Sequence, residues 1–273
     1  MKGCGGTTPT TLRAVPPLLE ILSAANVMAS SLRLGAGGAP AEGGSASATR
    51  PTVLLQQASR SLAGDAEGPL RHRVIRTDAV DGRERYELLT SLVVPRPIGW
   101  VSTRGATGVP NVAPFSFFSA VASSPMLVSL SIGTRGGVAK DSLRNILDRG
   151  AFCVNVVTEA QLEVMNRTAA SLPPEGDEFA FAGLSVAEAE TVDAPYVANC
   201  PAVLECELHK HVDLGNAGGL VLGEVRGVRL DPELPIVEGS AFVDSEGLRP
   251  VGRLWGFAYT LLREVRVLPR PEI

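Results

Sequence analysis

Histidine, cysteine and aromatic residues are scarce in this chain of 273 residues, which has three His, four Cys and 5% aromatic residues. The cysteines, Cys4, Cys153, Cys200 and Cys206, form no CxxC pair, so neither a disulfide framework nor a zinc site is expected. No apolar run approaches the roughly 20 residues that span a bilayer. The formal net charge of −4 argues against nucleic acid as the main partner. These absences favour a soluble, cytoplasmic protein of a reducing compartment.

Several catalytic signatures are also missing from the sequence. It contains no GxGxxG after a strand, no GxxxxGK[ST], no HExxH and no GxSxG. The usual signals of a dinucleotide fold, a nucleoside triphosphatase, a zinc protease and a serine hydrolase are therefore absent. His209 and His211 share one face of a predicted strand, but no third ligand lies near them in sequence, so no metal site is expected.

Residues 1–64 differ in composition from the rest of the chain. They carry five basic and two acidic side chains, are rich in Ala, Gly, Ser, Thr and Pro, and include the low-complexity stretch Gly35–Ser47. We expect a disordered or leader extension that the fold does not need. Organelle targeting, or a true start further along the chain, are the alternatives.

Beyond Arg83 the sequence consists mainly of short β-rich segments joined by short connections, which favours an antiparallel barrel with a few peripheral helices. The predicted strands are Pro97–Thr103, Val109–Pro114, Met126–Gly133, Ala151–Val157, Ala202–Leu214 and Leu220–Leu230. The predicted helices are Tyr86–Leu92, Lys140–Asp148 and Glu159–Ala170. With 45% hydrophobic residues, the chain can bury a sizeable core.

Hydroxyl, amide and basic residues cluster at predicted strand ends between residues 96 and 145. The clearest candidate is Lys140–Asp141–Ser142, which begins a helix shortly after Gly136–Gly137. Free N–H groups at a helix start, a lysine and a serine hydroxyl together suit a single phosphate group. The alternative is that Asp141 or Ser142 is a helix cap and Lys140 is merely solvated.

The order of these segments carries a resemblance to a known family. Between Tyr86 and Asn145 the chain reads YELLTSLVVPRPIGWVST, GVPNVAPFSFFSAVASSPMLVSLSIG and KDSLRNI. It continues with FCVNVVTEAQLEVMNRTAASLPPEGDEF, AVLECEL, LVLGEV and LRPVGRLWGFAY. This combination resembles the flavin reductase-like family of FMN-binding split barrels, over about residues 80–270. The resemblance implies a mainly β fold, a six-stranded antiparallel Greek-key split barrel, which forms a homodimer with FMN at the subunit interface.

The resemblance also implies which residues bind the cofactor. Three groups follow from the matching motifs: residues close to the flavin, residues that line its ring system, and residues that hold its phosphate. They are Arg96, Pro97, Ile98, Ser102 and Thr103 in the first group, Ala113, Pro114 and Ser116 in the second, and Lys140, Ser142 and Asn145 in the third. Arg253 and Tyr259 in GRLWGFAY are weaker candidates for cofactor or nicotinamide contacts.

The activity implied is that of an FMN-dependent oxidoreductase that takes hydride from NAD(P)H. The electrons would pass to free flavin, a partner oxygenase or another acceptor. One departure concerns the donor, because the loop DLGNAGGLVLGEV lacks the histidine that many nicotinamide-oxidising members carry there. Two alternatives remain open: a non-catalytic FMN electron carrier, and an FMN enzyme that acts directly on a small organic substrate. No catalytic acid or base is assigned, since the cofactor supplies the chemistry.

Overall fold

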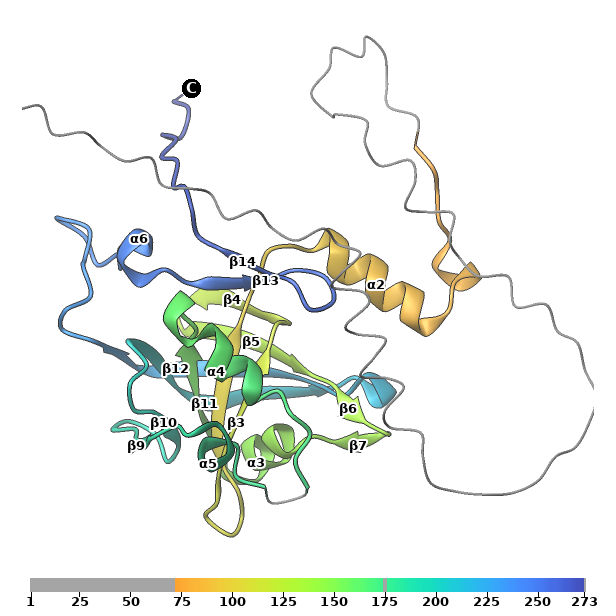
Figure 1. The fold of residues 1–273 in the computed structure, drawn as a ribbon, viewed down its shortest axis with the longest axis horizontal. Coiled ribbons are helices and arrows are strands. Elements are labelled where there is room, and N and C mark those ends of the chain that lie inside the picture. The colour runs from red at the N-terminus through yellow and green to blue at the C-terminus, as the bar shows by residue number, and fades with distance from the viewer. Residues whose placement is uncertain (1–71, 174–175, 273) are drawn as a thin grey trace, which may run out of the picture. The chain divides into compact units, whose positions relative to one another are not determined.

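A computed structural model describes residues 72–173 and 176–272. The expectation for residues 1–64 lies outside these ranges. The described chain is mainly β, with one large antiparallel sheet and a few short helices (Figure 1). No helix within the two described ranges is long and apolar enough to cross a membrane.

The large sheet contains seven strands in the order β3-β2-β8-β11-β12-β5-β4, and every neighbouring pair is antiparallel. In chain order the strands are β2 (Gly99–Arg104), β3 (Pro110–Phe115), β4 (Phe118–Ser123), β5 (Met126–Ile132), β8 (Ala151–Val156), β11 (Ala202–Asp213) and β12 (Gly219–Leu230). The predicted antiparallel split barrel is confirmed, although this sheet has seven strands where six were expected. The additional strand arises because the apolar run after Asn111 breaks at Ser116–Phe117, giving β3 and β4.

The sheet curves back on itself, since β3 and β4 stand at opposite ends of its order but are separated by only two residues. The N–H of Ser131 in β5 donates to the carbonyl of Phe117, between these strands, at 2.9 Å. Glycine permits one close approach inside the curved sheet: a Cβ on Gly223 of β12 would lie 2.3 Å from Cζ of Phe152. Any larger residue at position 223 would collide with the buried Phe152 ring, so glycine leaves room for that ring in the core.

Smaller strand pairs and short helices surround the sheet. The strands are β1 (Arg96–Pro97) with β13 (Val251–Arg253) and β14 (Tyr259–Leu261), β9 (Val186–Glu188) with β10 (Pro195–Val197), and β6 (Thr134–Arg135) with β7 (Val138–Ala139). The α-helices are α2 (Gly82–Leu92), α3 (Asp141–Arg149), α4 (Leu162–Arg167), α5 (Glu178–Ala182) and α6 (Ser245–Leu248). Three 3₁₀ turns cover Thr77–Ala79, Glu159–Gln161 and Gly215–Ala217.

Strands β2 and β8 are buried on both faces, and the polar residues they carry there, Ser102, Thr103 and Asn155, are hydrogen-bonded inside the protein. Trp100 belongs to a core cluster that also contains Met165 of α4 and Phe179 of α5. Its neighbour Val101 belongs to a second cluster, which contains Leu143 and Ile146 of α3. Helices α4 and α5 therefore cover one face of the central strands, while α3 packs against the other.

Candidate functional site

A cavity of about 420 Å³ opens at the N-terminus of α3, and we call it the α3 cavity. Its basic side chains come from β6 through the first turn of α3, its hydroxyl residues from α3 and the end of α4, and part of its apolar wall from β3. The residues that define its chemistry are Asn111, Ala113, Pro114, Phe115, Arg135, Lys140, Asp141, Ser142, Arg144 and Glu178. It is thus a cleft with a cationic rim and an apolar wall.

Lys140 is the N-cap residue of α3, and its side chain makes no capping hydrogen bond. Its ammonium lies 5.5 Å from the centroid of the Phe115 ring, and it belongs to none of the ion pairs of the described chain. Burial, and secondarily Arg135, lowers the pKa of Lys140. A half-buried cation without a counterion in a cleft is the arrangement expected where an anion binds.

The start of α3 offers backbone donors beside this lysine. The N–H groups of Leu143 and Arg144 donate to the Lys140 carbonyl, whereas those of Asp141 and Ser142 have no backbone acceptor within the described ranges. Arg144 contacts the Asp141 carboxylate and donates to the Ala139 carbonyl, so its charge is partly neutralised. Two free N–H groups and the positive end of the helix dipole therefore reinforce Lys140.

The Ser142 hydroxyl is already used within the protein. It donates to Asn111 Oδ1 at 2.9 Å, and that oxygen also accepts from the Thr103 hydroxyl at 3.1 Å. Asn111 Nδ2 donates in turn to Glu178 Oε2 at 2.7 Å, while Asn145 Nδ2 donates to Thr103 Oγ1 at 3.0 Å. This buried chain joins β2, β3, α3 and α5, so Ser142 can offer an anion its backbone N–H more readily than its hydroxyl.

A second cavity of about 430 Å³, the aromatic cavity, adjoins the first. The two share Pro114, Phe115, Lys140 and Ala169. The aromatic cavity is lined in addition by Tyr86, Ile98, Ser116, Phe117, Ser131, Gly133, Met165, Ala217, Arg253 and Tyr259. Three aromatic side chains that the α3 cavity lacks, Tyr86, Phe117 and Tyr259, line it, and together the two cavities form one groove with a cationic end and an aromatic end.

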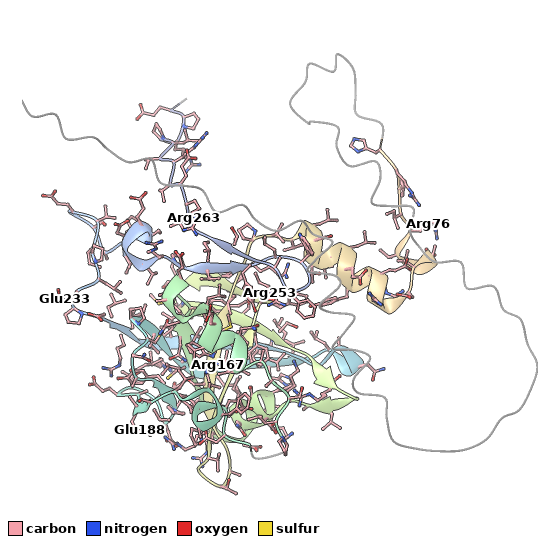
Figure 2. The ribbon with its side chains drawn as sticks, viewed as in Figure 1. Arg76, Arg167, Glu188, Glu233, Arg253 and Arg263 are labelled. Atoms are coloured by element: carbon pink, nitrogen blue, oxygen red, sulfur yellow. The ribbon has the colours of Figure 1, made fainter. Side chains whose placement is uncertain are left out.

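Arg253 of β13, labelled in Figure 2, is the register partner of Tyr259 on β14, and both line the aromatic end. The guanidinium carbon of Arg253 lies 4.4 Å from the centroid of the Tyr259 ring. The Tyr259 hydroxyl donates to Asn166 Oδ1 at 2.8 Å, which fixes the ring. The C-terminal segment thus returns to the groove, as the resemblance suggested.

Arg96 is 6% exposed, and its guanidinium donates hydrogen bonds to backbone carbonyls around it. Its guanidinium donates to the carbonyls of Thr90 and Leu254 at 2.6 Å and of Val93 at 2.7 Å. A longer contact of 3.4 Å reaches the Ser116 hydroxyl. Arg96 therefore ties α2 and the β13–β14 hairpin to the strand that leads to Ile98.

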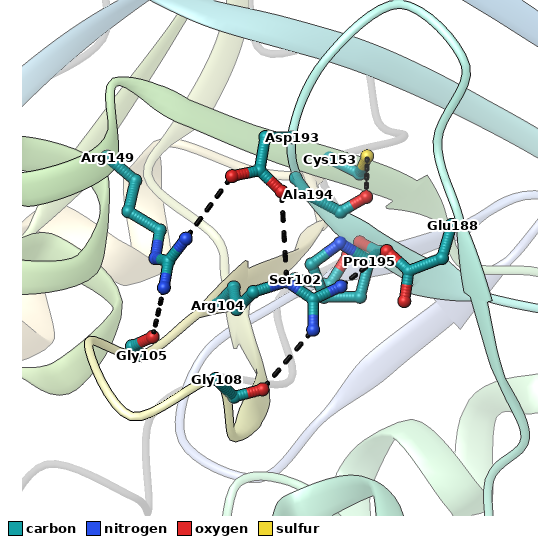
Figure 3. Close-up of polar contacts among 10 residues, drawn as sticks. All are labelled: Ser102, Arg104, Gly105, Gly108, Arg149, Cys153, Glu188, Asp193, Ala194 and Pro195. Atoms are coloured by element: carbon teal, nitrogen blue, oxygen red, sulfur yellow. Dashed lines mark hydrogen bonds and ion pairs between the residues drawn. The ribbon is translucent and has the colours of Figure 1, made fainter.

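The remaining predicted residues lie in three environments. Ser102 is buried and donates to the Pro195 carbonyl at 2.6 Å, beside the ion pairs of Arg104 and Arg149 with Asp193 (Figure 3). Thr103 is buried in the hydrogen-bond chain described above, and neither hydroxyl lines the groove. Asn145 lines a smaller cavity of about 200 Å³ beside Gly105. Pro97 is exposed and lines an apolar cavity between α2 and β4.

The structure brings six predicted cofactor-binding residues to the groove: Ile98, Ala113, Pro114, Ser116, Lys140 and Ser142. Sequence reasoning did not assign Arg135, Asn111 or Glu178 to the site. Arg135 follows β5 closely and could have been suggested by its position before the glycine pair. Glu178 lies 67 residues from its partner Asn111, and no local pattern connects them.

Comparisons with known proteins show which family the chain resembles. The family model described as "Flavin reductase like domain" matches residues 91–238. An uncharacterized protein of Halalkalibacterium halodurans is 37% identical over 202 residues, covering 72% of this chain and 95% of that protein. Nitrilotriacetate monooxygenase component B from Bacillus cereus superposes with a TM-score of 0.70 and 31% identity, covering 73% of this chain and 100% of that one. The 2-nitrobenzoate 2-nitroreductase of Pseudomonas fluorescens superposes with a TM-score of 0.67 and 29% identity, covering 73% of this chain and 96% of that one.

Proposed function

The chain belongs to the flavin reductase-like family, and on that premise we propose that it is an FMN-dependent oxidoreductase that takes hydride from NAD(P)H. The observation that carries the proposal is the groove, in which a cationic cavity and an aromatic cavity share Pro114, Phe115 and Lys140. A phosphorylated ring cofactor needs these two environments next to each other.

The residues present fit FMN at the phosphate end. The Lys140 ammonium and the N–H groups of Asp141 and Ser142 would hold the phosphate, because they are donors without acceptors of their own in the described chain. Only one compact anion site of this kind is assigned, and the chain has no diphosphate-binding glycine motif, which favours FMN over FAD. FMN, when bound, supplies a ring that accepts hydride and releases electrons.

The residues at the other end fit the ring system. Pro114 of β3 and Ile98 provide an apolar wall there, Ala113 continues this wall into the α3 cavity, and Ser116 lines the aromatic cavity beside it. Arg96 positions this wall indirectly, through the Thr90 and Leu254 carbonyls. We place the nicotinamide donor near Arg253 and Tyr259, whose stacked side chains line the same cavity.

The acceptor of the electrons is free flavin, a partner oxygenase or another acceptor. A partner oxygenase is favoured by the likeness to a monooxygenase component B. Direct reduction of a small organic substrate is the second candidate, favoured by the likeness to a 2-nitrobenzoate 2-nitroreductase. We further propose that the domain spans residues 80–270 and that the protein is cytoplasmic, where NAD(P)H is available.

A homodimer is part of the same proposal. Five of the six residues of β4 are exposed, although β4 contributes Ala120, Val121 and Ala122. Beside them an apolar cavity of about 360 Å³ is lined by Leu89, Val93 and Phe117. A second copy of the chain would cover this apolar surface and complete the site. Sedimentation that detects only a monomer, with FMN still tightly bound, would contradict this arrangement.

Anaerobic stopped-flow reduction tests the proposed activity. The FMN-loaded protein is mixed with NADH or NADPH, and loss of the oxidised flavin absorbance is compared with free FMN at the same concentration. We expect one donor to reduce the bound flavin far faster than free FMN. Reduction of the bound flavin no faster than that of free FMN, with either donor, would refute the reductase proposal and leave an electron carrier. Turnover of 2-nitrobenzoate by the reduced protein would favour the second candidate.

A further inference from the structure

Glu178 is a buried carboxylate in the wall of a cavity that otherwise suits an anion. It begins α5, is 7% exposed, and lines the α3 cavity with Lys140, Ser142 and Arg135. Within the described ranges it belongs to no ion pair, and its one side-chain partner is the Asn111 amide, at 2.7 Å from Oε2. An anion in this cavity would therefore share a low-dielectric space with a second negative charge.

The charged groups around Glu178 do not cancel that charge. From α3 and the segment before it, Arg135, Lys140, Asp141 and Arg144 line the same cavity. Arg144 is held by Asp141, whose charge opposes ionisation of Glu178. Strand β3 carries no titratable side chain, and Glu163 and Arg167 of α4 do not line the cavity. Burial is the largest influence and raises the pKa of Glu178; hydrogen bonds from backbone N–H groups and from Asn111 oppose the shift, and the Asp141 charge adds a small contribution in the direction of burial.

The hydrogen-bond chain links the charge of Glu178 to Ser142. An ionised carboxylate only accepts, so Asn111 must turn its N–H₂ toward Glu178 and its carbonyl toward Ser142. The Ser142 hydroxyl then donates its only proton to the Asn111 carbonyl, so it cannot donate to a bound anion. A protonated Glu178 can donate to the Asn111 carbonyl, and the turned amide can donate to Ser142 and Thr103, which frees the Ser142 proton for an anion.

We propose that Glu178 takes up a proton when a dianionic phosphate binds in the α3 cavity, and that this residue thereby sets the charge of the site. The proton comes from solvent, no covalent bond to the phosphate forms, and the bound anion faces a neutral carboxyl and a donating Ser142. Glu178 is a positioning residue, acting through Asn111 on Ser142. The inference rests on the proposed function in one respect, namely that the anion is the phosphate of FMN.

Calorimetric titration of the wild-type protein with FMN tests the coupling. At one pH between about 7 and 8, where a free phosphate monoester is mostly dianionic, the titration is run in two buffers of different ionisation enthalpy. The difference in observed heat gives the number of protons taken up. We expect up to one proton for wild type, and a dissociation constant that rises up to tenfold per pH unit over the range of uptake.

Three variants identify the group that takes up the proton. In Glu178→Gln uptake should disappear, and FMN should bind more tightly than to wild type at the alkaline end. In Lys140→Arg uptake should persist, since arginine stays protonated. Glu163→Gln, on α4 outside the cavity, is the matched control and should behave as wild type. Uptake that persists in Glu178→Gln but disappears in Lys140→Arg would assign the proton to Lys140 and overturn the inference.

Two further ligands separate this inference from the proposed function. Riboflavin, which lacks the phosphate, should bind without proton uptake. Inorganic sulfate, which does not titrate in this range, should show the same uptake as FMN. FMN binding without proton uptake overturns the role of Glu178 and leaves the proposed FMN-dependent function intact. If FMN does not bind, the proposed function fails, and proton uptake on sulfate binding alone decides the role of Glu178. If neither ligand binds, the proposed function and the role of Glu178 both fail.

Discussion

Removing the Lys140 ammonium is the most direct test of the phosphate end of the groove. Lys140 makes no ion pair in the described chain, so Lys140→Ala breaks no existing salt bridge and its effect reports on the ligand. A charge-assisted hydrogen bond is worth about 1.5–3 kcal/mol. Because burial lowers the pKa of Lys140, its charge is poorly hydrated, and the upper part of this range applies. The dissociation constant of FMN should therefore rise by about 40- to 150-fold, which corresponds to about 2.2–3 kcal/mol.

Fluorescence titration with FMN and riboflavin in parallel measures the effect. Riboflavin lacks the phosphate, so its affinity should barely change. The matched control is Lys210→Ala, an exposed lysine of β11 that lines neither cavity, and it should bind both ligands as wild type does. Equal losses for FMN and riboflavin would refute the reasoning, because Lys140 would then support the fold rather than the phosphate.

Three more predictions concern stability and domain limits. Arg96→Met should destabilise the protein by about 3 kcal/mol or more in urea unfolding, because three carbonyls lose a charged donor; a loss below about 1 kcal/mol would contradict this. The raised pKa of Glu178 means that its stabilising contribution is complete below 4.5 and is lost as pH rises through the folded-state value. Without ligand, the melting temperature of Glu178→Gln minus that of wild type should therefore increase as the pH is raised from about 4 to about 8. A difference that does not change with pH would exclude ionisation of Glu178 as the cause. A chain starting near Val80 should fold and bind FMN normally, judged by circular dichroism and titration; joint loss of solubility and flavin would contradict the proposed domain limits.

Much of the architecture could be predicted because its signals are local. Alternation and turn residues placed most strands within a residue or two, and the glycine pair before Lys140 located the start of α3. The break at Ser116–Phe117 escaped prediction because apolar residues continue through it without a turn signal. It depends instead on where the sheet curves, which is a property of the whole barrel.

The candidate site was predictable where residues meet the ligand through segments close in sequence, as for Pro114 and Lys140. The roles of hydroxyl residues were not predictable, because the sequence does not show whether a hydroxyl group binds a ligand or another group of the protein. Ser102 and Thr103 end a strand in a way that suits a ligand, yet both hydroxyls are used inside the protein. Glu178 joins the site only because α5 packs on β3, and contacts over 67 residues leave no periodic pattern.

Helix α3 contributes both to the hydrophobic core and to the proposed phosphate site, and this has a consequence for ligand binding. Leu143 and Ile146 are anchored in the core, one turn from the donors at the start of the same helix. The donors are consequently fixed before any anion arrives, and little conformational entropy is lost when one binds. The same anchoring transmits the binding energy to the barrel: an anion held there resists every opening motion that withdraws α3 from the core. Ligand occupancy should then slow hydrogen exchange deep in β2 and β8, far from any atom the ligand touches.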